Sequence, residues 1–130
     1  MAKNNCQLQL RMENDTLIAS LCGELDHHGA VAVRTLIDTE IRRLSPKETV
    51  LELSALEFMD SSGLGLVMGR YALMQKLGGE FRVSNPNERI MKIFRLAGLE
   101  RMVKIETASG SQGKTNKSRE RRTKNEAKGK

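Results

Sequence analysis

The hydrophobic and polar positions in the first part of the chain predict two β-strands. Residues 7–12 alternate polar and apolar side chains, as a strand buried on one face does. Residues 13–15 are a turn signal, and residues 16–22 are an apolar run rich in strand-forming residues. Because so short a turn separates the two strands, the pattern predicts a β-hairpin.

A helix is predicted to follow, after residues 23–25. Asp26 is a good N-cap, because its carboxylate can accept a hydrogen bond from the first helical turn. Apolar side chains then recur at spacings of three and four, which is the period of one buried helical face. These residues are Ala30, Val33, Ile37, Ile41 and Leu44. Ser45-Pro46 is expected to end the helix, because a residue before proline avoids the helical region.

The middle of the chain predicts a strand, a loop and a second helix. Residues 49–53 have the composition of a strand, and residues 54–60 are expected to form a loop with apolar anchors. The second helix is expected over about residues 62–77 and ends at the two glycines of residues 78–79. Its main apolar stripe is predicted to contain Leu64, Val67, Met68, Tyr71 and Met74.

Two more strands are predicted around a third helix. Residues 80–84 form the first strand, and Asn85, followed by proline, is expected to be the N-cap of the helix. The helix ends at Gly98, and residues 102–106 form the last strand. This order predicts a single α/β domain, with a mixed sheet that begins as a hairpin, continues as β-α repeats and has helices packed on it.

In such a sheet all the strand-to-helix corners open at one edge, which is where open α/β sheets place their sites. The corners are residues 23–28, 58–63 and 84–87. We therefore expect three helix N-termini, with their unpaired N–H groups and partial positive charge, to meet at that edge.

Composition and charge limit the possible partners of the folded part. Aromatic residues make up only 3% of the chain, so stacking platforms for bases or sugars are scarce. The net charge is +6, but residues 107–130 hold eight basic and two acidic residues, which leaves residues 1–106 formally neutral. The folded part is therefore not expected to bind nucleic acid. Residues 107–130, almost without apolar residues, are predicted to be a disordered basic tail, whose binding to nucleic acid stays open.

The remaining composition gives no sign of a membrane, metal or cofactor partner. Apolar runs stay well short of the ~20 residues that span a bilayer, and an apolar signal core is lacking, so a soluble cytoplasmic protein is expected. Cys6 and Cys22 lack the paired spacing of metal ligands. We interpret them as small hydrophobic residues in a reducing compartment. No metal or cofactor is predicted.

The segment FMDSSGLGLVMGRY, residues 58–71, is the sharpest chemical signal, with two adjacent serines at a helix start and glycines following. One interpretation is capping by Asp60 or Ser61, with glycines that allow close packing. Another is anion or nucleotide binding, although the spacing matches neither a P-loop nor the dinucleotide fingerprint. A third is phosphorylation of a serine, which would add roughly −1.5 to −2 charge where a helix N-terminus favours anions.

Catalysis by a nucleophilic serine is a weaker interpretation. His27 and His28 are the two histidines of the chain, and no pattern in the sequence indicates a catalytic triad or an oxyanion hole. The sequence thus favours a regulatory binding module over an enzyme. A nucleotide-binding or nucleotide-hydrolysing protein that uses the Gly-rich helix start is the alternative.

Residues 8–106 resemble the STAS domain of bacterial anti-sigma factor antagonists. The matching segments are GELDHH at 23–28, FMDSSGLG at 58–65, GRY at 69–71 and RLAGL at 95–99. DSSGLG is typical of the antagonists, and its combination with GELDHH and GRY favours the sporulation group, which acts on the anti-sigma factor of sigma F. The resemblance divides the chain into a STAS domain, residues 1–106, and the basic tail, residues 107–130, which lies outside the family pattern.

The resemblance implies a partner-switching mechanism. The unphosphorylated antagonist binds an ATP- or ADP-bound anti-sigma factor, which is also a serine kinase, and so frees the sigma factor. The kinase phosphorylates and releases the antagonist, and a PP2C-type phosphatase resets it. In this family the serine directly after the motif aspartate is the one that is modified, and here that serine is Ser61. Capping alone does not choose between Ser61 and Ser62. The partner surface is expected to contain Asp26, His27, Asp60, Ser61, Ser62 and Gly63.

Overall fold

The computed structural model describes residues 6–107, which form one sheet with three helices and a short 3-10 helix. The strands are β1 (Cys6–Glu13), β2 (Thr16–Leu25), β3 (Glu48–Met59), β4 (Glu80–Ser84) and β5 (Lys104–Glu106). The helices are α1 (His27–Leu44), α2 (Ser62–Lys76), α3 (Glu88–Leu96) and the 3-10 helix η1 (Leu99–Arg101). The predicted α/β class and the order of elements are confirmed.

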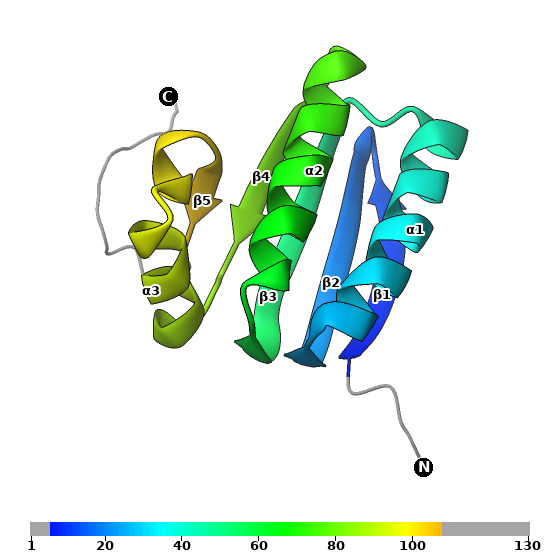
Figure 1. Cartoon of the computed structure of the whole chain (residues 1–130). Helices are drawn as coiled ribbons and strands as arrows, with labels where there is room; N and C mark the ends of the chain where they lie inside the picture. Colours follow the sequence, from blue (N-terminus) through cyan, green and yellow to red (C-terminus); the bar gives the residue numbers. More distant parts are fainter. Residues whose placement is uncertain (1–5, 108–130) are drawn as a thin grey trace.

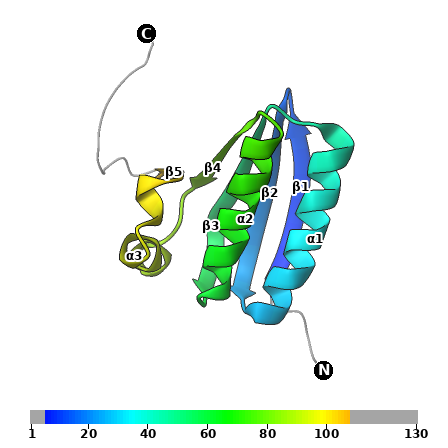
Figure 2. The same cartoon turned by 45° about the horizontal axis from the view of Figure 1, so that its top comes forward.

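The sheet is mixed, with its strands in chain order β1-β2-β3-β4-β5. β1 and β2 form the predicted antiparallel hairpin, and each later neighbouring pair is parallel. α1 and α2 lie side by side on one face of the sheet, while α3 lies toward the β4–β5 end (Figure 1). The turned view keeps α1 and α2 on that same face (Figure 2). The longest strands, β2 and β3, therefore lie beneath the two neighbouring helices.

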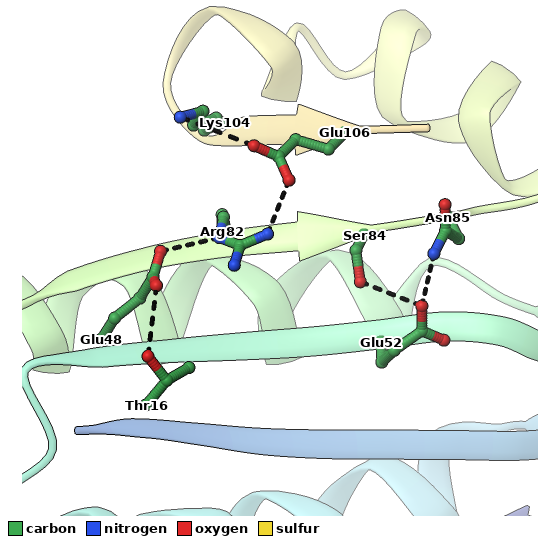
Figure 3. Close-up of polar contacts among 8 residues, drawn as sticks. All are labelled: Thr16, Glu48, Glu52, Arg82, Ser84, Asn85, Lys104 and Glu106. Carbon is green, nitrogen blue, oxygen red and sulfur yellow. Dashed lines mark hydrogen bonds and ion pairs between the residues drawn. The ribbon is translucent and has the colours of Figure 1, made fainter. Parts of the chain in front are cut away.

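Alternation along the strands gives the sheet one apolar face and one polar face. Leu17, Ala19 and Leu21 of β2 are buried in the core beneath the helices. The other face bears the polar side chains of Figure 3, where Arg82 of β4 binds Glu48 of β3 at 2.7 Å and Glu106 of β5 at 2.6 Å. These ion pairs connect three parallel strands on the face opposite α1 and α2 (Figure 1).

Two strands are longer than the sequence predicts, and the expected loop at residues 54–60 is wrong. β2 continues to Leu25 and pairs with β3 as far as Met59. The register between them shifts twice, so the two-residue alternation of buried and exposed positions is interrupted. Because Leu56 and Met59 are buried three residues apart, the segment does not show the period of a regular strand.

The third helix starts two residues later than predicted, because Asn87 and not Asn85 is its N-cap. The Asn87 side chain accepts a hydrogen bond from the N–H of Ile90 at 2.8 Å. Asn85 lies in the left-handed region, with φ of 58°, and its N–H bonds the carbonyl of Glu106. The last strand, predicted from residue 102, begins at Lys104, because the N–H groups of Met102 and Val103 still bond the carbonyl of Leu99 in the turn that follows η1.

The buried face of α2 also differs from the predicted stripe. Val67 and Met74 are buried as expected, but Met68 is 45% exposed. Arg70 takes a core position instead, with a side chain only 7% exposed and its Nε 2.8 Å from Oδ1 of Asp38 on α1. A buried arginine cannot be recognised from hydrophobic periodicity, since its place depends on a carboxylate 32 residues away in the chain.

The charge around Arg70 is not balanced. Burial lowers the pKa of its guanidinium, Asp38 opposes this, and the positive charges of Arg34 and Arg42 lower the pKa further. Asp38 is thus the carboxylate that compensates a buried charge between α1 and α2.

Within residues 6–107, no helix is long and apolar enough to cross a bilayer.

We predict that Asp38→Ala lowers the free energy of unfolding by about 2–3 kcal/mol, because it leaves the Arg70 guanidinium buried without its partner. Urea denaturation followed by circular dichroism measures this. The control is the double variant Asp38→Ala with Arg70→Met, which removes both charges and should recover at least half of the loss. A cost below 0.5 kcal/mol for Asp38→Ala alone would contradict the role given to this pair.

Candidate functional site

The ends of β2 and β3 bring two helix starts together. Leu25, the last residue of β2, pairs with Met59, the last residue of β3, and the N–H of Asp60 bonds the carbonyl of Leu25 at 3.2 Å. Each strand then leads into a helix: β2 into α1, which begins at His27, and β3 into α2, which begins at Ser62. Both helices therefore begin at the same edge of the sheet (Figure 1).

A carboxylate stands at each of these two helix starts. Oδ1 of Asp26 accepts the N–H of Gly29 at 2.8 Å, which confirms Asp26 as the N-cap of α1. Oδ1 of Asp60 accepts the N–H of Ser62 at 2.9 Å and also the hydroxyl of Ser62. Ser61 already has a helical backbone and makes no capping hydrogen bond. The capping role that the sequence left open between Asp60 and Ser61 thus belongs to Asp60.

The two serines are consequently in different states. Ser62 is half-buried and its hydroxyl donates to Asp60. Ser61 is exposed, and its hydroxyl takes no part in the cap. The sequence alone offers two equivalent hydroxyl groups, whereas the folded chain presents one of them to solvent.

The carboxylate beside Ser61 is held in its charged form. The hydroxyl of Ser62 lowers the pKa of Asp60, and the N–H of Ser62 and the nearby His27 lower it further, against a smaller opposing effect of desolvation. Asp60 is therefore ionised at neutral pH, and any group added to Ser61 would lie next to a negative charge.

The motif glycines have different roles. A Cβ at Gly63 would lie 2.5 Å from Sδ of Met59, so this glycine is needed for the packing of α2 on β3. A Cβ at Gly65 or Gly69 would meet nothing within 4 Å. Close packing within the chain thus explains only the first of the three.

The third strand-to-helix corner does not join the other two in direct contact. β4 ends opposite Glu52 of β3, well before the end of that strand. The Asn87 side chain donates to the carbonyls of Leu56 and Glu57 at 3.2 Å each, not to residues around Ser61. Of the predicted surface, Asp26, His27 and Asp60–Ser62 lie at one corner, and Gly63 is buried beneath it.

The two histidines and the metal-ligand residue types within residues 6–107 bear on catalysis and on metal binding. His27 and His28 are exposed at the start of α1, and no hydrogen bond in this range joins either histidine to Ser61. No group of three or more His, Cys, Asp or Glu side chains in the same range could hold a metal ion.

Comparisons with known proteins assign the family. The STAS domain family matches residues 7–111. An anti-sigma F factor antagonist of Paenibacillus polymyxa is 40% identical over 101 residues, which cover 78% of this chain and 86% of that protein. The chain belongs to the STAS family of anti-sigma factor antagonists.

Solved structures of this family share the fold. The unphosphorylated form of the anti-sigma factor antagonist SpoIIAA superimposes with a TM-score of 0.70 at 34% identity, over 79% of this chain and 89% of that one. The phosphorylated form of the Bacillus SpoIIAA gives 0.65 at 34% identity, over 79% and 92%. The STAS fold expected from the motifs is therefore confirmed. The predicted boundary at residue 107 stays a prediction, since residues 108–130 lie outside the described residues.

We predict that Asp26→Ala lowers the free energy of unfolding by about 1 kcal/mol, because the N–H of Gly29 loses its acceptor. Asp26→Ser, which keeps a capping oxygen, should lose less than half of that. Chemical denaturation of both variants measures the difference. Equal losses for alanine and serine would show that the capping bond does not stabilise α1.

Proposed function

We propose that this STAS domain is an anti-sigma factor antagonist of the sigma F type, switched by phosphorylation of Ser61. In the unphosphorylated state it binds a cytoplasmic anti-sigma factor that is also an ATP-dependent serine kinase, and so releases the sigma factor. A PP2C-type phosphatase returns the phosphorylated form to the active state. The proposal is supported by the relative named as an anti-sigma F factor antagonist and by the exposed Ser61.

The observation that carries the choice of Ser61 is the difference between the two hydroxyl groups. Transfer of a phosphoryl group requires the acceptor oxygen to reach the γ-phosphate in the active site of the kinase. The half-buried hydroxyl of Ser62 donates to Asp60, and its modification would remove that hydrogen bond and place the phosphate against the carboxylate. Ser61 is exposed and makes no capping bond, so its modification leaves the hydrogen bonds of the cap in place.

A phosphate on Ser61 should change the surface but not the fold. The N-terminus of α2 favours an anion, because its first N–H groups carry a partial positive charge. The phosphate would nevertheless add a near-dianion beside the ionised Asp60, in a contact suited to a neutral hydroxyl. Like charges forced together in an interface cost several kcal/mol, and even ~3 kcal/mol weakens binding about a hundredfold. Such a loss is large enough for a switch.

Asp26 is proposed to belong to the partner surface in addition to capping α1. It is exposed, and its strand end is paired with the one that leads to Ser61. Asp26→Ser keeps the cap but loses the carboxylate. We therefore expect this variant to fold normally and to bind the anti-sigma factor more weakly. Normal binding would remove Asp26 from the partner surface.

The test of the switch compares three variants with the cognate kinase and ATP, using intact mass, phosphopeptide mapping and a binding assay. Ser61→Ala should bind the kinase but accept no phosphate. Ser61→Asp should keep its melting temperature and bind at least tenfold more weakly than the wild type. Ser62→Ala should still be phosphorylated on Ser61, at a lower rate because the cap is altered.

Phosphate mapped to Ser62, or wild-type binding by Ser61→Asp, would contradict the proposed switch. Incubation of the protein alone with ATP or GTP is the control for the alternative function. Nucleotide turnover that disappears in Ser61→Ala would identify a nucleotide-hydrolysing protein instead.

We further propose that residues 107–130 are dispensable for partner switching, because the net charge of +6 lies in this segment while residues 1–106 are formally neutral. A chain ending at Glu106 should melt within about 2 °C of the full chain and be phosphorylated at a similar rate. Thermal melts and a kinase time course measure both quantities. Loss of kinase binding by the shortened chain would show that the tail belongs to the interface.

A further inference from the structure

A groove of about 290 Å³ runs between α1 and α2, directly behind the helix starts that flank Ser61. Its walls include His27, Val31 and Arg34 from α1 and Ser62, Gly65 and Leu66 from α2. The apolar side chain of Val31, which lines the groove, is 44% exposed. Apolar surface beside a switch residue is a common feature of interaction sites.

The glycines of α2 add an observation that packing within the chain does not explain. Glycine inside a helix destabilises it relative to alanine, because glycine loses more backbone entropy on folding. Gly65 lines the groove, and Gly69 follows one helical turn later. Added Cβ atoms would meet nothing at either position, so the fold would accept alanine at both. A groove wall without side chains allows another chain to approach the helix backbone closely.

The charge along the groove favours an acidic occupant. Arg34 lines the groove. The charges of Arg34 and Arg42 both act on the guanidinium of Arg70. Asp38 pairs with Arg70, which leaves this part of α1 and α2 with more guanidinium groups than carboxylates. Arg43, by contrast, is compensated by its own ion pair with Glu40 at 2.7 Å. Of the arginines named here only Arg34 lines the groove, so Arg34 is the cation that a carboxylate of an occupant would meet there.

We propose that this groove is the second part of the partner surface, where an acidic segment of the anti-sigma factor packs apolar side chains against Gly65 and Val31 and places a carboxylate beside Arg34. The inference rests on the proposed function, since the occupant belongs to the same partner that reaches Ser61. It assigns recognition to α1 and α2 beyond the helix starts, and it explains why α2 has a glycine at position 65 that its own packing does not require.

The first test adds side-chain volume without harming the fold. Gly65→Ala should raise the melting temperature by about 2–5 °C, as alanine is the better helix former, yet weaken binding of the cognate anti-sigma factor about tenfold. Gly65→Met should weaken binding at least a hundredfold. Gly69→Ala is the matched control on the same helix, because its methyl group would also meet nothing within 4 Å and Gly69 does not line the groove; it should stabilise α2 similarly and bind like the wild type.

The second test addresses charge. Arg34→Gln should weaken binding about tenfold and reduce its dependence on salt, whereas Arg89→Gln, an exposed change on α3, should leave both unchanged. Wild-type affinity in both Gly65 variants, or in Arg34→Gln, would overturn the groove as a docking site. That failure differs from failure of the proposed function, in which the wild-type chain itself forms no complex or is not phosphorylated on Ser61.

Discussion

β2 and β3 stay hydrogen-bonded to each other as far as Leu25 and Met59, and this parallel pairing determines where the proposed partner surface lies. Because both strands end at the same level, the helices that follow must start side by side. Asp26 and Asp60 then satisfy N–H groups at the two helix starts, which would otherwise be unpaired. Backbone pairing in the sheet thus places the exposed Ser61, which follows Asp60, at this edge.

Residues of the DSSGLG segment divide into those that hold the helix and those that the fold does not require. Asp60 and Ser62 form the cap, and Gly63 makes room for Met59. Ser61 and Gly65 make no such contribution, and both are exposed. A surface that contributes little to stability can accept a phosphate or a partner without unfolding, which is what a reversible binding module needs.

Much of the fold could be predicted from the sequence, because the hairpin, α1 and its cap depend on short-range patterns. The proline after Asn85 favours Asn85 as the cap of α3, but the backbone of Asn85 bonds β5 in the folded chain and Asn87 caps the helix instead. The end of β3 was missed because register shifts against β2 break its alternation. At the site, Asp26 can be predicted as a cap, whereas the choice of Asp60 over Ser61, the state of each serine and the burial of Arg70 depend on contacts made only after folding.

The most direct test of this account is calorimetric titration of the anti-sigma factor with the chain phosphorylated enzymatically on Ser61, beside the unphosphorylated chain, with thermal melts of both forms. The account predicts melting temperatures within about 3 °C of each other and an affinity at least a hundredfold lower for the phosphorylated form. Equal affinities, or a phosphorylated chain that has lost its cooperative melt, would contradict a switch that acts on the interface and leaves the fold unchanged.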